Sequence, residues 1–195
     1  AEVQGIVDQP YQISSVVGMQ ARFADLTVAS ASTRSHGELR NRLLYGLLFE
    51  SARPMLLEPA ADNFALTLAP KTVVVAWDGG LPASRAVMLA TNLLESSEVV
   101  DIVCIDPKGD ELVSGQAPGW DLAGYLSRHG ISVTVTELPS GGAQTDQALT
   151  RHASELGAEL IVMGAYGHSR LREKILGGTT RAILDQCAIP VFMAH

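Results

Sequence analysis

The sequence predicts an α/β fold with an open, doubly wound parallel sheet, and two observations carry this prediction. Along residues 71–195, short apolar runs rich in β-branched residues alternate with segments in which apolar residues recur at helical spacing. The short runs are nearly continuous, as expected of strands that are covered on both faces. Strands that alternate with helices form βαβ crossovers, so these strands should assemble into a parallel sheet.

The elements are expected in a regular order along the chain. The first strand is expected at 72–76, and Pro82 suits the first turn of the helix that follows. Gly130 and Gly157 should end two later helices, because glycine readily takes the left-handed conformation that closes a helix. Asp121 should cap the first of these two helices. The remaining strands are expected at 99–105, 131–138, 160–163 and 189–193, and the remaining helices at 121–129, 144–156 and 181–186.

The first part of the chain repeats the later part of this pattern. Residues 24–30 resemble 158–164, and residues 53–57 resemble 189–193. Self-similarity of this kind indicates a duplicated structural unit. The final strands of the two copies are apolar and are expected at sheet edges. Because exposed edges have to be covered, we expect these two strands to lie side by side.

The first copy of the unit is incomplete in this sequence. Segments 3–7 and 14–21 correspond to the third strand and the helix after it, and no segment corresponds to the first two strands. We therefore expect three parts: the C-terminal half of a first repeat in 1–59, an Ala- and Pro-rich linker in 60–70 and a complete domain in 71–195.

Composition excludes several classes of protein. The net charge of −7, from 14 basic and 21 acidic residues, disfavours binding to a nucleic-acid backbone. The longest apolar runs are too short to span a bilayer, and the first residues lack a secretory signal pattern. Cys104 and Cys187 form neither a disulfide framework nor a zinc motif. We therefore expect a cytoplasmic protein without nucleic-acid or membrane partners.

Two glycine elements form the most informative motif. Gly164-Ala165-Tyr166-Gly167 directly follows a predicted strand, and Gly177-Gly178-Thr179-Thr180 directly precedes the last helix. Successive backbone N–H groups at such turns and at a helix N-terminus can hold a phosphate. The basic residues Arg170, Arg172 and Lys174 lie between the elements, which suits a small anion. The alternatives are an ordinary glycine turn and a solvated basic face.

Asp78 is a second candidate, directly after the first strand and before Gly79 and Gly80. Open α/β sheets bind ligands at the carboxyl ends of their strands, where the strand order reverses. A carboxylate at this place could accept a hydrogen bond from a ribose hydroxyl or an adenine amino group. The alternative is a turn aspartate in front of two glycines.

In these residues and the segments around them, the sequence resembles the universal stress protein family. The resemblance rests on the segments 73–78, 103–106, 161–170 and 175–180, covers 71–195, and extends in degenerate form to 1–59. It implies an adenine nucleotide alpha hydrolase-like sheet of five strands in the order 3-2-1-4-5. It also implies tandem repeats, and pairing of edge strands within a chain or across a homodimer.

The resemblance further implies a bound nucleotide, ATP or else ADP or AMP, with Mg or Mn as a companion ion. The residues that match the family's nucleotide contacts are Ala76, Trp77, Asp78, Cys104, Met163, Gly164, Tyr166, Gly167, Gly177, Gly178, Thr179 and Thr180. His168 and Arg170 are further candidates near the phosphates, although a solvated loop is the alternative for His168. Stress response as a nucleotide sensor would be the function.

Three departures from the family pattern affect this expectation. Gly178 stands where the family has Ser or Thr, so a hydroxyl is lost and only the backbone N–H remains. Trp77 is bulky where a small residue is usual, and would either stack on the base or fill its pocket. The first repeat has residues 30–33, Ser-Ala-Ser-Thr, in place of the glycine turn, so we expect no phosphate site there.

Other chemistries find little support in the sequence. The five histidines show no metal-ligand spacing, and neither a G-x-S-x-G elbow nor a Walker A motif occurs. No residue is an evident general base for water, so slow ATP hydrolysis is the most that we expect. The main alternative to nucleotide sensing is a nucleotide-free protein-interaction module of the same fold, with its pocket filled by Trp77. A hydrolase or nucleotidyl transferase on this scaffold is a third possibility.

Overall fold

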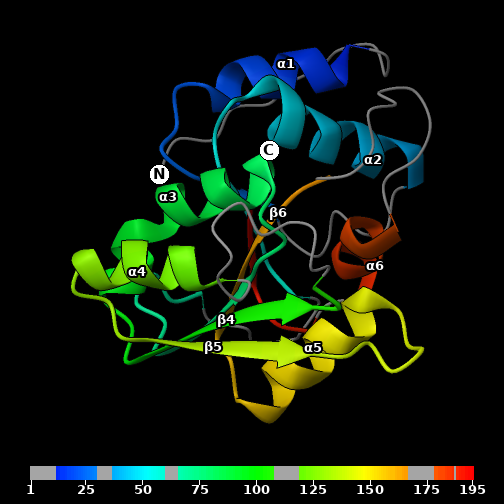
Figure 1. Ribbon diagram of the computed structural model, residues 1–195. Coiled ribbons are helices and arrows are strands. Elements are labelled where there is room, and N and C mark those ends of the chain that lie inside the picture. Colours follow the sequence, from blue (N-terminus) through cyan, green and yellow to red (C-terminus); the bar gives the residue numbers. More distant parts are fainter. Residues whose placement is uncertain (1–11, 30–36, 60–65, 108–118, 167–177, 187) are drawn as a thin grey trace.

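The computed structural model describes residues 12–29, 37–59, 66–107, 119–166, 178–186 and 188–195 (Figure 1). The helical elements are α1 (Ile13–Ala21), α2 (Gly37–Tyr45), the π-helical turn η2 (Gly46–Glu50), α3 (Leu81–Glu95), α4 (Trp120–Arg128), α5 (Thr145–Glu155) and α6 (Gly178–Gln186). The strands are β1 (Thr27–Ala29), β2 (Met55–Leu57), β3 (Thr72–Ala76), β4 (Val99–Ile105), β5 (Val133–Leu138), β6 (Leu160–Gly164) and β7 (Val191–Ala194).

The strands form one sheet in the order β1-β2-β7-β6-β3-β4-β5. Every neighbouring pair is parallel except β2 and β7, which run antiparallel with Leu56 opposite Phe192. These are the two segments that we expected to lie side by side. The α/β fold with a mostly parallel sheet is thus confirmed, and the N-terminal segment continues the same sheet.

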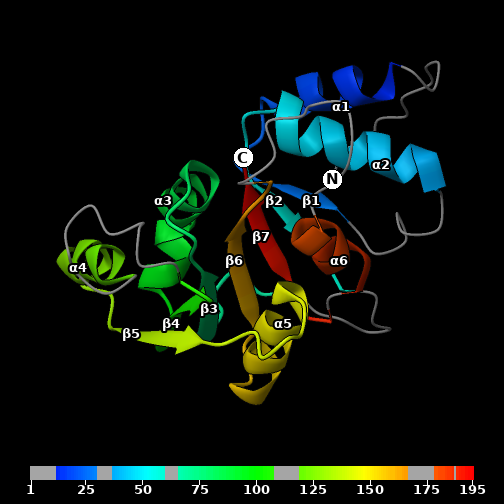
Figure 2. The ribbon, with the colours of Figure 1, turned by 45° about the vertical axis from the view of Figure 1, so that its right-hand side comes forward.

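Helices cover both faces of the sheet (Figure 2). One face carries α3 and α4, whose buried side chains pack on alternate strand residues such as Val73, Val75 and Ile102. The opposite face carries α2, η2, α5 and α6, which pack on the intervening residues such as Val74 and Ile161. Burial on both faces explains why the strands read as continuous apolar runs.

The helix ends follow the expected turn chemistry, with one correction. Gly130 and Gly157 adopt positive φ directly after α4 and α5, and Pro82 lies in the first turn of α3. Asp121, however, is not the cap of α4, because the helix already begins at Trp120. Gly119 precedes it with a φ of 82°. Asp121 therefore lies within the first turn, where its negative charge interacts favourably with the positive end of the helix dipole.

The N-terminal segment packs its own helices closely. A Cβ on Gly18 would lie 2.5 Å from the Cβ of Glu50, and one on Gly46 would lie 2.3 Å from the carbonyl oxygen of Ser14. The two glycines thus let α1 approach η2. The predicted strand at 3–7 and the linker residues 60–65 lie outside the described residues. No helix in the described ranges is both long enough and apolar enough to cross a membrane.

Candidate functional site

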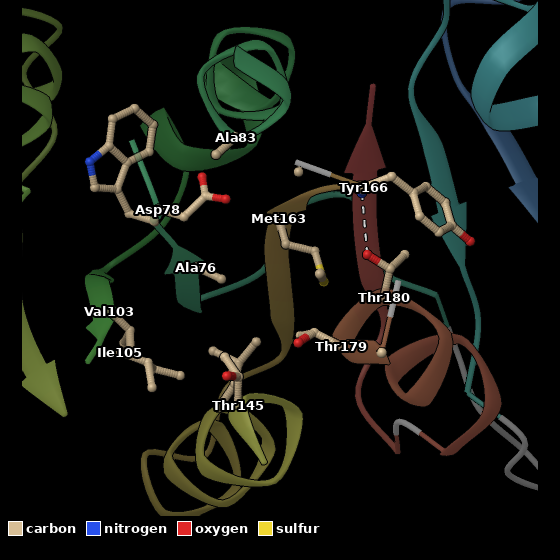
Figure 3. A pocket seen from close by; sticks show the side chains of 14 residues that line it. Ala76, Asp78, Ala83, Val103, Ile105, Thr145, Met163, Tyr166, Thr179 and Thr180 are labelled. Carbon is tan, nitrogen blue, oxygen red and sulfur yellow. Dashed lines mark hydrogen bonds between the residues drawn. The ribbon is translucent and has the colours of Figure 1, made fainter. Parts of the chain in front are cut away.

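A cavity of about 420 Å³ opens at the carboxyl ends of β3, β4 and β6 (Figure 3). β3 lies between β4 and β6 in the sheet, and the strand order reverses at β3. A ligand site is expected at this point of an open α/β sheet. The residues that line it are Ala76, Trp77, Asp78, Ala83, Val103, Ile105, Thr145, Leu149, Met163, Gly164, Tyr166, Gly178, Thr179 and Thr180.

Most of the wall is apolar and comes from the sheet and α5. Val103 and Ile105 of β4 line the cavity, and so do Met163 of β6 and Leu149 of α5 (Figure 3). Of the segment 103–106, only Cys104 was expected to contact a ligand, and neither Val103 nor Ile105 was. Strand periodicity could have found them, because they alternate with Cys104 and therefore point to the other face of the sheet.

The first turn of α6 forms the polar end of the cavity, with Gly178, Thr179 and Thr180 among the lining residues. The first N–H groups of a helix have no partner within the helix and carry its positive dipole end. Thr180 is buried, and its Oγ1 accepts a hydrogen bond of 3.3 Å from the N–H of Tyr166 (Figure 3). This bond ties the turn after β6 to the start of α6.

A model of the universal stress protein family matches residues 70–195. The chain belongs to the universal stress protein family. Universal stress protein Slr1230 of Synechocystis sp. is 38% identical over 66 residues, which are 34% of this chain and 22% of that protein. The chain therefore spans about a fifth of the length of this curated relative.

Solved structures of universal stress proteins share the fold. One from Archaeoglobus fulgidus DSM 4304 aligns with a TM-score of 0.68 at 20% identity, over 93% of this chain and 64% of that one. Another from Archaeoglobus fulgidus aligns with a TM-score of 0.51 at 21% identity, over 62% of this chain and 96% of that one. The first likeness includes most of the N-terminal segment as well as the family domain.

Gly164, the first glycine of the family motif, serves packing in this structure. A Cβ on it would lie 2.4 Å from the backbone nitrogen of Ala83 and 2.6 Å from the carbonyl carbon of Pro82. The first turn of α3 thus occupies the Cβ position, while Gly164 itself lines the cavity, so its contact with a phosphate stays a prediction. The glycine thus lets α3 sit directly against the end of β6.

Gly178 differs from Gly164 in this respect. Among the described residues, no atom lies within 4 Å of a Cβ built on Gly178, and the residue is exposed at the mouth of the cavity. A side chain can therefore be added here without disturbing the described fold. The hydroxyl that the family usually places at this position is absent, and Thr179 is the neighbouring hydroxyl that lines the cavity.

Tyr166 lines the cavity through its backbone, while its ring points away from it (Figure 3). The residue has a φ of 62°, which is unusual for a side chain other than glycine. Its ring packs against Phe49 of η2, with 5.0 Å between ring centroids. Burial raises the pKa of its hydroxyl, which has no hydrogen-bond partner within the described residues.

Asp78 and Trp77 form the wall at the end of β3. Oδ1 of Asp78 accepts a 2.9 Å hydrogen bond from the N–H of Gly80, which is the turn role that we weighed as its alternative. The carboxylate nevertheless lines the cavity. The Trp77 side chain packs against the core on the α3 and α4 face, and the cavity stays open beside it.

Of the remaining residues that were expected to contact a ligand, one lies away from the cavity and the others lie outside the described residues. Cys104 is buried in the core beneath α3 and α4 and does not line the cavity. Outside the described residues lie Gly167, His168, Arg170, Arg172, Lys174 and Gly177. Where the chain is described, no group of three His, Cys, Asp or Glu side chains could hold a metal ion.

Cys104 is expected to resist alkylation in the folded protein. Burial, together with the negative charge of Glu137, raises the pKa of its thiol to about 11, so the reactive thiolate is scarce at pH 8. In a Cys187→Ser background, iodoacetamide labelling followed by mass spectrometry should be slow at pH 8 and should accelerate toward pH 11. Labelling of the folded protein as fast as that of the urea-unfolded protein would contradict this assignment.

Proposed function

We propose that the cavity binds an adenine nucleotide, ATP or else ADP or AMP. The observation that carries the proposal is the open first turn of α6, where the N–H groups of residues 178–180 border a cavity at the topological switch point. A helix N-terminus in this position favours a phosphate. The volume of about 420 Å³ lies within the range of about 300–1,000 Å³ that is usual for small-molecule sites.

The rest of the cavity suits the nucleoside. Ala76, Val103, Ile105 and Met163 offer an apolar surface to the faces of a planar base, while Asp78 offers an acceptor for a ribose or amino donor. The phosphates would then lie toward Thr179 and Thr180. Mg or Mn would arrive with the phosphates, because the described residues supply no metal cluster of their own.

The role that fits this site is nucleotide sensing or sequestration in the stress response. Asp78 is the described carboxylate in the cavity wall, and it already accepts a hydrogen bond from Gly80. A general base must reach the proton of an attacking water. We therefore propose slow ATP hydrolysis at most, in a cytoplasmic protein.

We also propose that 1–59 is the C-terminal half of a first repeat, joined through 60–70 to the family domain. Two observations support this. The unit β1-α2-β2 has the element order of β6-α6-β7, with the two strands parallel and adjacent in both units. The units then meet through the antiparallel β2 and β7. We also propose that the protein forms a homodimer, as the family resemblance implies. Equilibrium sedimentation, which measures the mass of the particle in solution, would test this proposal.

Nucleotide binding can be tested on protein purified without added nucleotide. After gel filtration and heat release, mass spectrometry should detect an adenine nucleotide, and ATP with Mg should raise the Tm. No released nucleotide and no thermal shift would favour the interaction module instead. A nucleotide other than an adenine nucleotide would overturn the proposed specificity but not the site.

Gly178→Val is expected to weaken ATP binding at least tenfold while the protein stays folded. The valine side chain would enter the open space at the first turn of α6, where the phosphate is proposed to lie. Gly124→Val is the matched control, since Gly124 is an exposed helical glycine of α4 whose added Cβ meets nothing closer than 3.9 Å. Titration calorimetry would measure both variants. Equal affinity of Gly178→Val and wild type would contradict the phosphate position.

A further inference from the structure

The N-terminal segment contacts α6 through a buried arginine. Arg40 lies on α2 and is 8% exposed. Its Nη1 donates to Oδ1 of Asp185 at 2.6 Å, and its Nη2 donates to the carbonyl oxygen of Leu184 at 2.7 Å. Both acceptors lie in the last turn of α6. One guanidinium group therefore holds the C-terminal end of the helix whose other end borders the cavity.

This contact is built to hold α6 in one orientation. A positive charge at a helix C-terminus interacts favourably with the negative end of the helix dipole, and charge-assisted hydrogen bonds are stronger than neutral ones. Two separate nitrogens of a planar group also restrict direction, which a single point charge does not. Because α6 has only nine residues, a tilt at its C-terminal end displaces the N–H groups of its first turn.

A second contact from the same segment reaches the turn after β6, next to the start of α6. Phe49 of η2 packs on the ring of Tyr166 and, at 4.6 Å between centroids, on that of His195. Nδ1 of His195 in turn donates to the carbonyl oxygen of Ala165 at 2.8 Å. The turn after β6 is thus held from the N-terminal segment, and its Tyr166 N–H meets Thr180 in α6.

We propose that residues 37–50 form a structural part of the nucleotide site and that Arg40 is its positioning residue. Arg40 does not line the cavity, so it acts through α6 by keeping the N–H groups of residues 178–180 directed at the phosphate. This inference rests on the proposed function. It adds that the family domain at 70–195 depends on the preceding segment for its full affinity.

A reciprocal effect follows from linkage. If docking of residues 37–50 strengthens nucleotide binding, then nucleotide must strengthen this docking by the same factor. ATP should therefore slow hydrogen exchange in α2, even though α2 contributes no residue to the cavity wall. A contact that serves stability alone would not produce an exchange effect specific to α2.

The test is ATP affinity of the full chain carrying Arg40→Leu, measured by calorimetry well below the Tm. We expect affinity to fall about tenfold, within the usual range of coupling between sites. Arg42→Leu is the matched control, because Arg42 lies on the same helix and pairs with Glu38 of that helix at 2.6 Å. Arg40→Lys keeps the charge but replaces the two separate nitrogens by one, so it should keep part of the affinity that Arg40→Leu loses.

A second measurement does not depend on ATP. In nucleotide-free protein, the N–H groups of residues 178–180 should exchange faster in Arg40→Leu than in Arg42→Leu or wild type. If Arg40→Leu fails to fold, Phe49→Leu takes its place and should show the same pattern.

The outcomes separate the two proposals. Absence of ATP binding by wild type would overturn the proposed function and, with it, the nucleotide role of Arg40. Wild-type binding with unchanged affinity in Arg40→Leu would overturn this inference alone. Reduced affinity without faster exchange at residues 178–180 would overturn the proposed route through α6.

Discussion

Gly164→Val is expected to destabilise the folded protein by about 3 kcal/mol, at the upper end of typical overpacking costs. The side chain would enter the space of the Ala83 nitrogen and the Pro82 carbonyl carbon, both of which are backbone atoms. Neither can move without shifting the start of α3 away from β6. In a protein of this size, such a loss corresponds to a fall in Tm of roughly 6 to 12 °C.

Thermal unfolding of nucleotide-free protein by circular dichroism measures this effect. Gly178→Val is the internal comparison, because it adds the same side chain to the second glycine element, where no atom of the described residues lies within 4 Å of the added Cβ. Its Tm should stay close to that of wild type. If Gly164→Val kept the wild-type Tm and lost only nucleotide binding, this glycine would serve the ligand site and not the packing of α3.

Asp101→Ala is expected to cost about 3 kcal/mol, as is usual when one partner of a buried charged network is removed. Asp101 lies on β4 and is 4% exposed. Its Oδ1 accepts a 2.8 Å bond from the hydroxyl of Thr136, and its Oδ2 a 2.7 Å bond from Nε2 of His152. Without the carboxylate, the partly buried hydroxyl of Thr136 on β5 and the partly buried imidazole of His152 on α5 lose their partner.

Urea unfolding would measure this loss as a lower midpoint. Glu98→Ala is the matched control, since Glu98 is a carboxylate just before β4 that pairs with Lys71 at 3.1 Å while both side chains are 68% exposed. An exposed pair of this kind contributes at most about 1 kcal/mol. Equal midpoints for the two variants would contradict a stabilising role for the Asp101 network. The network also joins β4 to α5, whose Thr145 lines the cavity.

Many strand and helix boundaries could be predicted, because they follow from local patterns of residues. The boundaries of β3 and β4 match the expected ranges 72–76 and 99–105, and Pro82, Gly130 and Gly157 mark helix ends through their own backbone preferences. The pairing of β2 with β7 followed from two apolar edges that needed cover. The boundaries depended on each residue and its neighbours in the chain, whereas the pairing also used the likeness of 53–57 to 189–193.

The cavity wall was predicted less completely. The motif residues of β3, β6 and α6 line it, but Thr145 and Leu149 come from α5, which carries no motif, and Val103 and Ile105 were quoted for the resemblance without being named as site residues. Tyr166 and Cys104 were expected to contact the ligand, yet the ring of one packs on Phe49 and the other lies in the core. A motif names positions, whereas the direction of a side chain depends on the elements packed around it.

Local patterns along the chain were enough to predict the alternation of strands and helices and the family to which the chain belongs. Apolar periodicity and glycine positions are local properties, so they can be recognised along one chain. Which space each residue fills became visible in the folded protein alone. Gly164 makes room for α3, and Arg40 reaches Asp185 across 145 positions of sequence. Such contacts arise from packing between distant elements, and no local pattern specifies them.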